Sequence, residues 1–395
     1  MLDFEFYAPT RIIFGKTAMD SLPDQLEKNG AAKVLLVHSG GKGSKAAVDD
    51  AKKLMEKAGV QYSEFFGVKP NPLLSKVLEG IEFCKKDPPD FLLAVGGGSV
   101  IDTAKGIAAG VRLKDGEDIW KDYYFPKARF KDAIPMGVVL TIPAAGSEAS
   151  FGTVVTHDEL KTKRYTGGEP LLPKFAILNP EYTKTLPPYQ TASGVFDIVA
   201  HLIERYFVKH PNNDLSDRMI EACIRTMLVN APILMKDPAN YDARAEVMWT
   251  GCIAHNKILE MGRTHGDWSS HDTAHELSGQ YDMSHGASLA VILPAWMKYV
   301  YKHDIPKFLQ FSCRVFDVDI AYDHPEAAIE EMIARLENFS HVMGLPTRLK
   351  DAGIDDGKFD LMAKTALDGR QYVGTGNGVY LLKEKDVKAV YHLAY

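Results

Sequence analysis

The sequence has little of what marks secreted, membrane-spanning or metal-thiolate proteins. Its 395 residues include four cysteines with no CxxC pair, which argues against a disulfide framework or a thiolate zinc cluster and favours a reducing cytoplasm. No run approaches the roughly 18 apolar residues of a membrane-spanning helix, and the N-terminus lacks the apolar stretch of a secretory signal. The cysteines are Cys84, Cys223, Cys252 and Cys313.

A strong excess of one charge is also missing. Lys and Arg total 46 against 52 Asp and Glu, a formal net charge of −6. Such a balance provides no general attraction to phosphate backbones or anionic lipids, so neither nucleic acid nor a membrane is an expected partner. With 46% hydrophobic and 25% charged residues the chain resembles ordinary globular proteins, and its length predicts two or three domains.

The first 180 residues alternate predicted strands and helices. Short runs rich in β-branched and aromatic residues predict strands at 11–14, 33–37, 60–66, 91–95 and 137–142. Amphipathic stretches between them predict helices at 18–28, 44–58, 72–86 and 100–111. This βαβ order predicts a parallel sheet that is covered by helices on both faces.

Beyond residue 191 the pattern is helical throughout. Long amphipathic stretches at 197–208, 214–235 and 240–259 follow one another without a convincing strand. The proline-rich segment 179–190 suits a connection between domains. We therefore expect an α/β domain over residues 1–185 and an all-helical domain over residues 186–395.

A glycine-rich turn follows the fourth predicted strand. Gly96, Gly97, Gly98 and Ser99 lead into a predicted helix, and the free N–H groups at a helix start favour an anion such as a pyrophosphate. The turn lacks the third glycine of GxGxxG, so a plain tight turn is the alternative.

A second such turn, residues 39–44 (SGGKGS), follows the strand at 33–37. Two glycine-rich turns in one parallel sheet favour a dinucleotide over a single phosphate. NAD-binding proteins usually place a carboxylate on the adenosine ribose, whereas this turn offers hydroxyls and lysines, among them Ser44 and Lys45. The turn therefore favours NADP(H) over NAD(H), although Glu64 on the next strand could serve NAD.

An acid and several histidines in the helical half have the spacing of metal ligands. Asp197 and His201 lie four residues apart, on one face of a helix, and His271 and His275 repeat that spacing. His285 follows His271 at a distance along the chain that leaves room for a helix and a turn, so the chain could bring His285 back toward His271. Asp197, His201, His271 and His285 could bind one divalent ion such as Fe²⁺, Zn²⁺ or Mn²⁺, while a helix hydrogen bond is the alternative for an Asp/His pair.

Together these motifs resemble those of a known family. The sequence GGGSVIDTAK at 96–105, the DxxxH helix at 197–201 and the HxxxH followed by His285 and Gly286 are similar to the iron-containing (group III) alcohol dehydrogenases, in the branch of butanol dehydrogenases and NADPH-dependent aldehyde reductases. The resemblance extends from near the start of the chain through its C-terminal helices. It implies a dinucleotide-binding (Rossmann-like) α/β domain followed by an all-α metal-binding domain.

The resemblance also implies an activity and a set of site residues. It implies hydride transfer between NAD(P)H, with NADP(H) favoured, and a primary alcohol or aldehyde such as butanol or butanal, in a homodimer. One ion, Fe²⁺ or Zn²⁺, is implied at Asp197, His201, His271 and His285, with His275 as the active-site histidine. The implied cofactor contacts are Gly40, Gly41, Ser44, Asn71, Gly97, Gly98, Ser99, Thr141, Lys163, Tyr182 and Leu186.

The sequence departs from the family pattern near residue 144. The family's TxxGTGSE reads TIPAAGSE here, so Ala144 and Ala145 lack hydroxyl groups, and Phe151 is larger than usual. We expect His275 to relay a proton as a general acid, or else only to shape the pocket, and we expect the site between the two halves.

Two other functions remain open at this point. One is a relative of the same fold, such as a polyol (glycerol-type) dehydrogenase or dehydroquinate synthase. The other is a non-catalytic protein that binds a nucleotide and a metal, because a fold does not dictate a function.

Overall fold

The structure, a computed structural model, describes residues 1–124, 128–209, 213–321 and 323–395. The chain forms two units, and each is built from separate segments. The first contains Tyr7–Leu186 and Ala239–Asn256, and the second contains Met1–Phe6, Pro187–Pro238 and Lys257–Tyr395. The contiguous ranges expected from the sequence differ from these units mainly in helix α7 (Tyr241–His255), whose Met248 and Cys252 are buried in the core of the sheet.

A six-stranded parallel sheet forms the centre of the first unit, with strand order β1-β8-β5-β4-β2-β3. Its strands are β1 (Arg11–Phe14), β2 (Lys33–His38), β3 (Gln61–Phe65), β4 (Phe91–Gly97), β5 (Met136–Ile142) and β8 (Phe175–Leu178). The helices that follow its first strands are α1 (Leu22–Lys28), α2 (Lys45–Lys57), α3 (Leu74–Lys86) and α4 (Gly98–Gly110).

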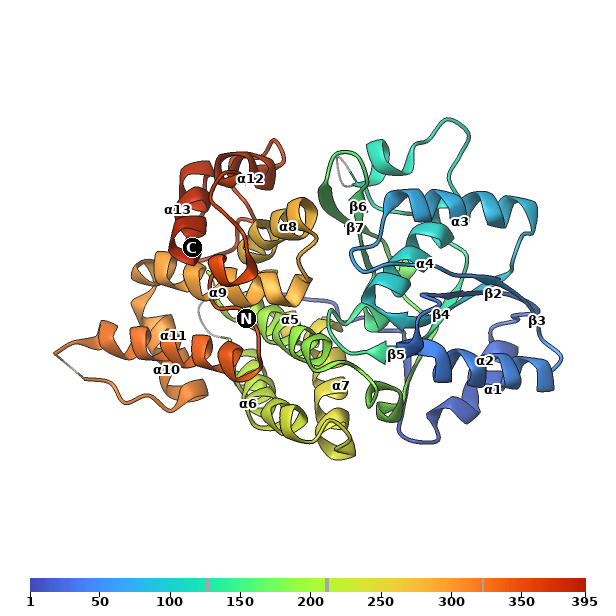
Figure 1. Ribbon diagram of the computed structural model, residues 1–395, viewed down its shortest axis with the longest axis horizontal. Coiled ribbons are helices and arrows are strands. Elements are labelled where there is room, and N and C mark those ends of the chain that lie inside the picture. The colour runs from blue at the N-terminus through green and yellow to red at the C-terminus, as the bar shows by residue number, and fades with distance from the viewer. Residues whose placement is uncertain (125–127, 210–212, 322) are drawn as a thin grey trace. The chain divides into compact units, whose positions relative to one another are not determined.

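Helices cover both faces of this sheet (Figure 1). Successive side chains of a strand point to opposite faces. Leu35 and Val37 of β2 therefore pack with α3 and α4, while Val34 and Leu36 pack with α1 and α2. Burying such a side chain contributes about 1.5–3 kcal/mol, which explains why these strands are apolar on both faces.

Three strands of the first unit are absent from the sequence prediction. Strand β8 has four residues, all buried, and it pairs with both β1 and β5. The hairpin of β6 (Gly152–His157) and β7 (Thr162–Gly167) has polar residues in both strands and forms a separate antiparallel pair. The five predicted strands are all present, with ends that agree to within two residues.

The second unit is helical in its described part, with an isolated bridge between Val208 and Gly378. It contains α5 (Pro188–Tyr206), α6 (Asp214–Lys236), α8 (Ser269–Tyr281), α9 (His285–Val300), α10 (Ile305–Phe316), α11 (Pro325–Val342), α12 (Phe359–Leu367) and α13 (Glu384–Ala394). Helix α5 begins earlier than expected, because Pro188 suits the first position of a helix. The predicted fold class, an α/β part followed by an all-α part, is confirmed.

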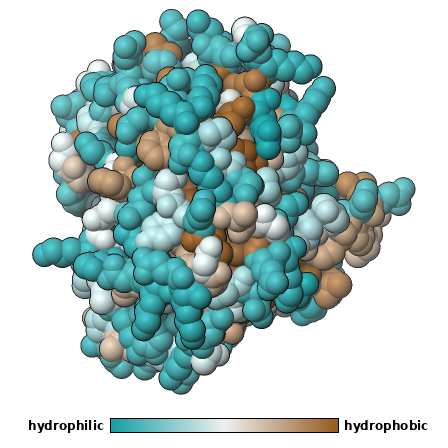
Figure 2. Space-filling view, turned by 90° about the vertical axis from the view of Figure 1, so that its right-hand side faces the viewer, coloured by the Kyte–Doolittle hydropathy of each residue, from teal (hydrophilic) through white to brown (hydrophobic). Residues whose placement is uncertain are grey.

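Helix α9 is the central helix of this unit. Its residues from Gly286 to Met297 are all buried, and it packs against α5, α8, α11 and α13. None of the described helices combines the length and apolar character that crossing a bilayer requires. Figure 2 shows a face of the molecule on which hydrophilic residues predominate and apolar residues form only small patches.

Candidate active site

The two glycine-rich turns lie at the same edge of the parallel sheet. Strands β2 and β4 are neighbours, with His38 opposite Val95, so the turn at 39–44 and the turn at 96–99 both leave the carboxyl ends of adjacent strands. Chain order also reverses here, since β3 lies on one side of β2 and β4 on the other. Ligands of open α/β sheets bind outside the carboxyl ends at such a switch point.

The turn after β4 can approach a ligand closely. A Cβ at Gly97 would lie 2.8 Å from Cβ of Ile142, whereas a Cβ at Gly98 would meet only Ala145, at 3.8 Å. Gly97 is the N-cap of α4, a helix of 13 residues, and Gly98 and Ser99 are partly exposed. The N–H groups of this helix start could therefore hold a phosphate.

The turn after β2 is held by His38 and Glu64. Burial lowers the pKa of His38, so its neutral ring accepts a hydrogen bond from the Gly40 N–H at Nδ1 (3.1 Å) and donates from Nε2 to Glu64 (3.2 Å). Lys52 also pairs with Glu64, at 2.5 Å. Ser44 is buried, and its hydroxyl lies 3.1 Å from that of Ser39.

The remaining predicted cofactor contacts belong to the same unit. Asn71 follows β3, has a left-handed backbone (φ +50°) and accepts a hydrogen bond from Lys163 at 3.2 Å. Thr141 is buried in β5. Tyr182 follows β8 and donates a hydrogen bond to Asp50 of α2, at 2.7 Å, and Leu186 is buried near the end of the same segment.

The predicted metal ligands converge in the second unit. Asp197 and His201 lie one turn apart on α5, and His271 approaches them from α8. One ligand atom from each residue lies within 4.8 Å of the others, and all three residues are buried. His285, the first residue of α9, is outside this tight group, but its Nε2 is 3.8 Å from Oδ1 of Asp197.

Comparison with known proteins identifies the family. Family models match residues 9–180 as "iron-containing alcohol dehydrogenase" and residues 191–395 as the C-terminal part of the same family. The chain belongs to the iron-containing alcohol dehydrogenase family. It is accordingly an NAD(P)-dependent oxidoreductase of alcohols and aldehydes, as the resemblance implied.

Relatives of this alcohol dehydrogenase match it over nearly their whole length. It is 40% identical to a probable NADH-dependent butanol dehydrogenase of Bacillus subtilis, with 99% of both chains covered. It is 35% identical to the NADPH-dependent aldehyde reductase YqhD of Escherichia coli, covering 96% of this chain and 97% of that one. The crystal structure of NADH-dependent butanol dehydrogenase A from Thermotoga maritima superposes with a TM-score of 0.94 at 35% identity, covering 100% of this chain and 99% of that one.

The residues of this alcohol dehydrogenase fit a divalent ion. Nε2 of His271 is buried and has no hydrogen-bond partner among the described residues, and its nearest acid is Asp197, with Oδ1 at 3.9 Å. An imidazole nitrogen left in this state is the expected ligand atom of a metal. One carboxylate and several imidazoles, without sulfur, are suited to Fe²⁺ or Zn²⁺.

Glu204 orients His271 and has no counterpart in the sequence analysis. Its Oε1 accepts hydrogen bonds from the backbone N–H of His271 and from Nδ1 of its ring, both at 3.0 Å, and from the hydroxyl of Ser270 at 2.5 Å. Its Oε2 accepts from the N–H of Trp268 at 2.7 Å. Because Nδ1 carries the donated proton, Nε2 retains the lone pair for a metal. Glu204 lies three residues after His201, but its partners lie more than 60 residues further along the chain.

His275 lies one helical turn beyond His271. Its ring centroid is 5.1 Å from that of His285 and 6.5 Å from that of His271. The residue is 9% exposed, slightly more than Asp197, His201 or His271. Trp268 packs edge-on against the rings of His201 and His271, and the guanidinium of Arg205 lies over its ring at 4.7 Å.

The close approach of α9 to α5 fixes the position of His285. A Cβ at Gly286 would lie 1.8 Å from the carbonyl oxygen of Ser193, so only glycine permits this approach. The hydroxyls of Ser193 and Ser284 are 2.6 Å apart, which joins the two helices beside His285.

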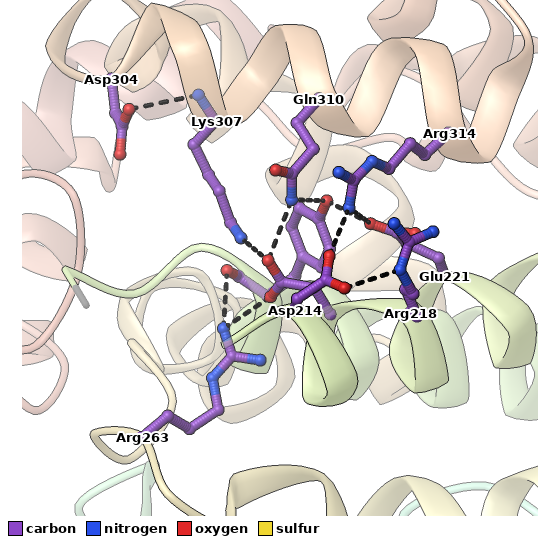
Figure 3. A network of polar contacts seen from close by, with 10 residues as sticks. Asp214, Arg218, Glu221, Arg263, Asp304, Lys307, Gln310 and Arg314 are labelled. Atoms are coloured by element: carbon purple, nitrogen blue, oxygen red, sulfur yellow. Dashed lines mark hydrogen bonds and ion pairs between the residues drawn. The ribbon is translucent and has the colours of Figure 1, made fainter. Parts of the chain in front are cut away.

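An ionic network that is buried at Arg263 and Asp217 and exposed at its other end holds the far end of α5 (Figure 3). Asp217 of α6 accepts hydrogen bonds from Arg263 (3.0 Å) and from Lys307, and burial lowers the pKa of both cations. Tyr206, the last residue of α5, donates to Glu221 at 2.7 Å. The network therefore ties α5 to α6, to α10 and to the segment that leads into α8.

Proposed function

We propose that this protein is a metal-dependent aldehyde reductase that uses NADPH to reduce primary aldehydes such as butanal, and that it oxidises the corresponding alcohols in reverse. The observation that carries the proposal is the buried group of Asp197, His201 and His271, with Glu204 holding the ring of His271. We propose His285 as the fourth ligand, because its Nε2 already lies 3.8 Å from Asp197.

In this reaction the chain's own residues bind the cofactor and hold a proton, while the ion and the nicotinamide supply the remaining chemistry. A bound divalent ion supplies Lewis-acid polarisation of a carbonyl group. The nicotinamide supplies hydride. We propose that α4 and the turn at 96–99 bind the pyrophosphate, with Gly97, Gly98 and Ser99 in contact. His275 holds the proton that the product alcohol requires, which is general acid catalysis worth about 10²–10⁴-fold.

The preference for NADPH rests on the turn after β2. Lys42 and Lys45 stand at this turn, and Ser44 provides a hydroxyl for a 2′-phosphate, while Gly40 and Gly41, whose N–H groups bond to His38 and Ser39, surround the ribose. Two nearby acids are engaged elsewhere: Glu64 pairs with Lys52 and His38, and Asp50 accepts from Tyr182. Partnered carboxylates are less suited to receive the ribose hydroxyls of NADH.

The other proposed contacts surround this edge of the sheet. Asn71, Thr141, Tyr182 and Leu186 lie in or after the carboxyl ends of β3, β5 and β8, and Lys163 joins Asn71. We propose that they contact the rest of the cofactor. The name of the Escherichia coli relative supports NADPH and aldehydes, while the names of the Bacillus subtilis and Thermotoga maritima relatives support butanol and NADH.

Steady-state kinetics test this proposal. Protein stripped of metal is reconstituted separately with Fe²⁺ and Zn²⁺, and the oxidation of NADPH and NADH is followed with a series of aldehydes. We expect metal-dependent turnover with a higher kcat/KM for NADPH, and substitution of Ser44 and Lys45 with alanine should raise the KM for NADPH alone. Equal or better kcat/KM with NADH would overturn the cofactor assignment.

The same assay separates the alternative functions. Faster oxidation of glycerol or 1,3-propanediol than of butanol would favour a polyol dehydrogenase. Cofactor and metal binding without turnover on any substrate would favour a non-catalytic protein. The ion that restores the higher kcat is the proposed physiological metal.

We further propose that the enzyme is a cytoplasmic homodimer. Strand β1 is an edge of the sheet, and the preceding segment exposes Phe4, Phe6 and Tyr7, which suits pairing with a second copy. The four cysteines form no disulfide, as suits a reducing compartment. Sedimentation of the protein as a monomer alone would overturn the dimer.

A further inference from the structure

A lysine ammonium is fully buried inside the α/β unit. Lys105 of α4 is 0% exposed, and its Nζ lies within hydrogen-bond distance of four oxygens. These are the carbonyl of Ser147 (2.7 Å), its hydroxyl (3.0 Å), the carbonyl of Ser150 (2.8 Å) and that of Gly152 (2.9 Å). An ammonium has three donors, so all of them are used on one short segment, residues 147–152. Burial of a charge is costly without such partners.

Asp102, which lies one turn before Lys105 on α4, binds the same segment. Its carboxylate accepts a hydrogen bond from the hydroxyl of Ser147 at 2.7 Å and from the N–H of Val154 at 3.2 Å. Its backbone carbonyl accepts from the hydroxyl of Thr153 at 2.9 Å. The hydroxyl of Ser147 thus connects Lys105 and Asp102, and residues 147–154 are fastened to one face of α4.

The fastened segment adjoins the proposed cofactor cradle. It follows β5, which carries Thr141, and it begins directly after Ala145 and Gly146. Ala145 is the neighbour that a Cβ at Gly98 would meet, at 3.8 Å. Helix α4 therefore provides the phosphate cradle at its first turn, and two turns later it anchors the chain that passes beside that cradle.

We propose that Lys105 is a positioning residue for the nicotinamide cofactor: its ammonium holds residues 147–152 on α4 and so keeps Thr141 and Ala145 in place beside Gly97 and Gly98. Lys105 itself does not touch the cofactor. The inference rests on the proposed function, because that function assigns the cofactor to this cradle. Lys105 is not among the proposed cofactor contacts.

Direct binding measurements on the metal-loaded enzyme test the inference. The dissociation constant of NADPH is measured by fluorescence titration for the wild type, for Lys105→Met, which replaces the ammonium with an apolar chain of similar length, and for Ser147→Ala. We expect Lys105→Met to raise the Kd and the KM for NADPH at least tenfold, with the KM for butanal changed less than twofold at saturating cofactor. Ser147→Ala retains the carbonyl acceptors and should raise the Kd about threefold.

A core variant of the same helix separates positioning from stability. Ile107 is fully buried in α4 and packs toward α3, so Ile107→Ala destabilises the helix without touching residues 147–152. Its Kd for NADPH should stay within twofold of the wild type. A wild-type Kd in Lys105→Met, or a Kd raised equally by Ile107→Ala, would overturn the inference.

A second measurement tests the inference in the absence of cofactor. Amide hydrogen exchange of residues 147–152 should accelerate at least tenfold in Lys105→Met, and less in Ile107→Ala. If the wild type binds neither NADPH nor NADH, the proposed function fails, while this exchange still decides whether Lys105 holds the segment. If Lys105→Met does not fold, Lys105→Arg and Ser147→Ala decide the inference, since wild-type Kd and exchange in both would contradict it.

Discussion

The fixed orientation of His271 can be tested by replacing Glu204 with glutamine. The carboxylate of Glu204 is 1% exposed and accepts four hydrogen bonds, three at Oε1 and one at Oε2. A glutamine has one oxygen and one NH₂ group at these positions. In either orientation its NH₂ group faces at least one of the donors from Trp268, Ser270 or His271, and that buried donor loses its acceptor.

Glu204→Gln is expected to lower two separate quantities, the stability of the metal-free protein and its affinity for the metal. A buried donor without an acceptor costs about 1–3 kcal/mol, so the free energy of unfolding of the metal-free protein should fall by that amount in Glu204→Gln. The negative charge that strengthens the bond to Nδ1 of His271 is lost as well. Residues in this position typically contribute about 10–100-fold to metal affinity, which corresponds to about 1.4–2.7 kcal/mol.

Metal affinity is measured by competition for Zn²⁺ with a chromophoric chelator. Glu221→Gln is a matched control, because Glu221 is also a buried carboxylate of this unit but accepts from Tyr206 rather than from a histidine. We expect the control to lose stability while its Zn²⁺ affinity remains that of the wild type. Wild-type affinity in Glu204→Gln, or an equal loss in the control, would refute the role of Glu204.

Three further outcomes follow from the geometry. His275→Ala should lower kcat for butanal by about 10²–10⁴-fold and flatten its pH profile, and near-wild-type turnover across pH would exclude a proton relay. Gly286→Ala should lower the melting temperature markedly, because the added Cβ meets the carbonyl of Ser193, and an unchanged melting curve would contradict that contact. Burial raises the pKa of the Glu148 carboxyl from 4.5 to about 7, so the stability that this group contributes is complete below pH 4.5 and is lost as the pH rises through 7. Glu148→Gln should therefore stabilise the protein more at pH 8 than at pH 5 in thermal unfolding, and an equal effect at both would contradict the raised pKa.

Local patterns predicted those parts of the structure in which neighbouring residues act together. The side chains of Leu35 and Val37 point to one face of the sheet and those of Val34 and Leu36 to the other, so a run of a few apolar residues predicts a strand that is buried on both faces. Likewise, Asp197 and His201 are four residues apart on one helix, and the spacing alone places both on one face. Both features depend on the period of the backbone, which any sequence displays directly.

The unpredicted parts depend on distant partners. Glu204 acts on a ring 67 positions further along the chain, and nothing near Glu204 indicates this. Strand β8 is stabilised by pairing with β1 and β5, and which strands pair depends on the whole sheet. Lys105 was expected only as the last residue of the motif at 96–105, within a helix, and its burial is explained by residues 147–152, whose oxygens accept its hydrogen bonds.

The division of the chain into interleaved units has a consequence for proteolysis and truncation. The chain passes from one unit to the other at residues 6/7, 186/187, 238/239 and 256/257, so no single cut releases either unit whole. A fragment that ends at residue 186 would lack α7 and would expose the core surface that Met248 and Cys252 cover. We therefore expect such a fragment to aggregate when it is expressed alone, and to become soluble when residues 239–256 are joined to it through a flexible linker.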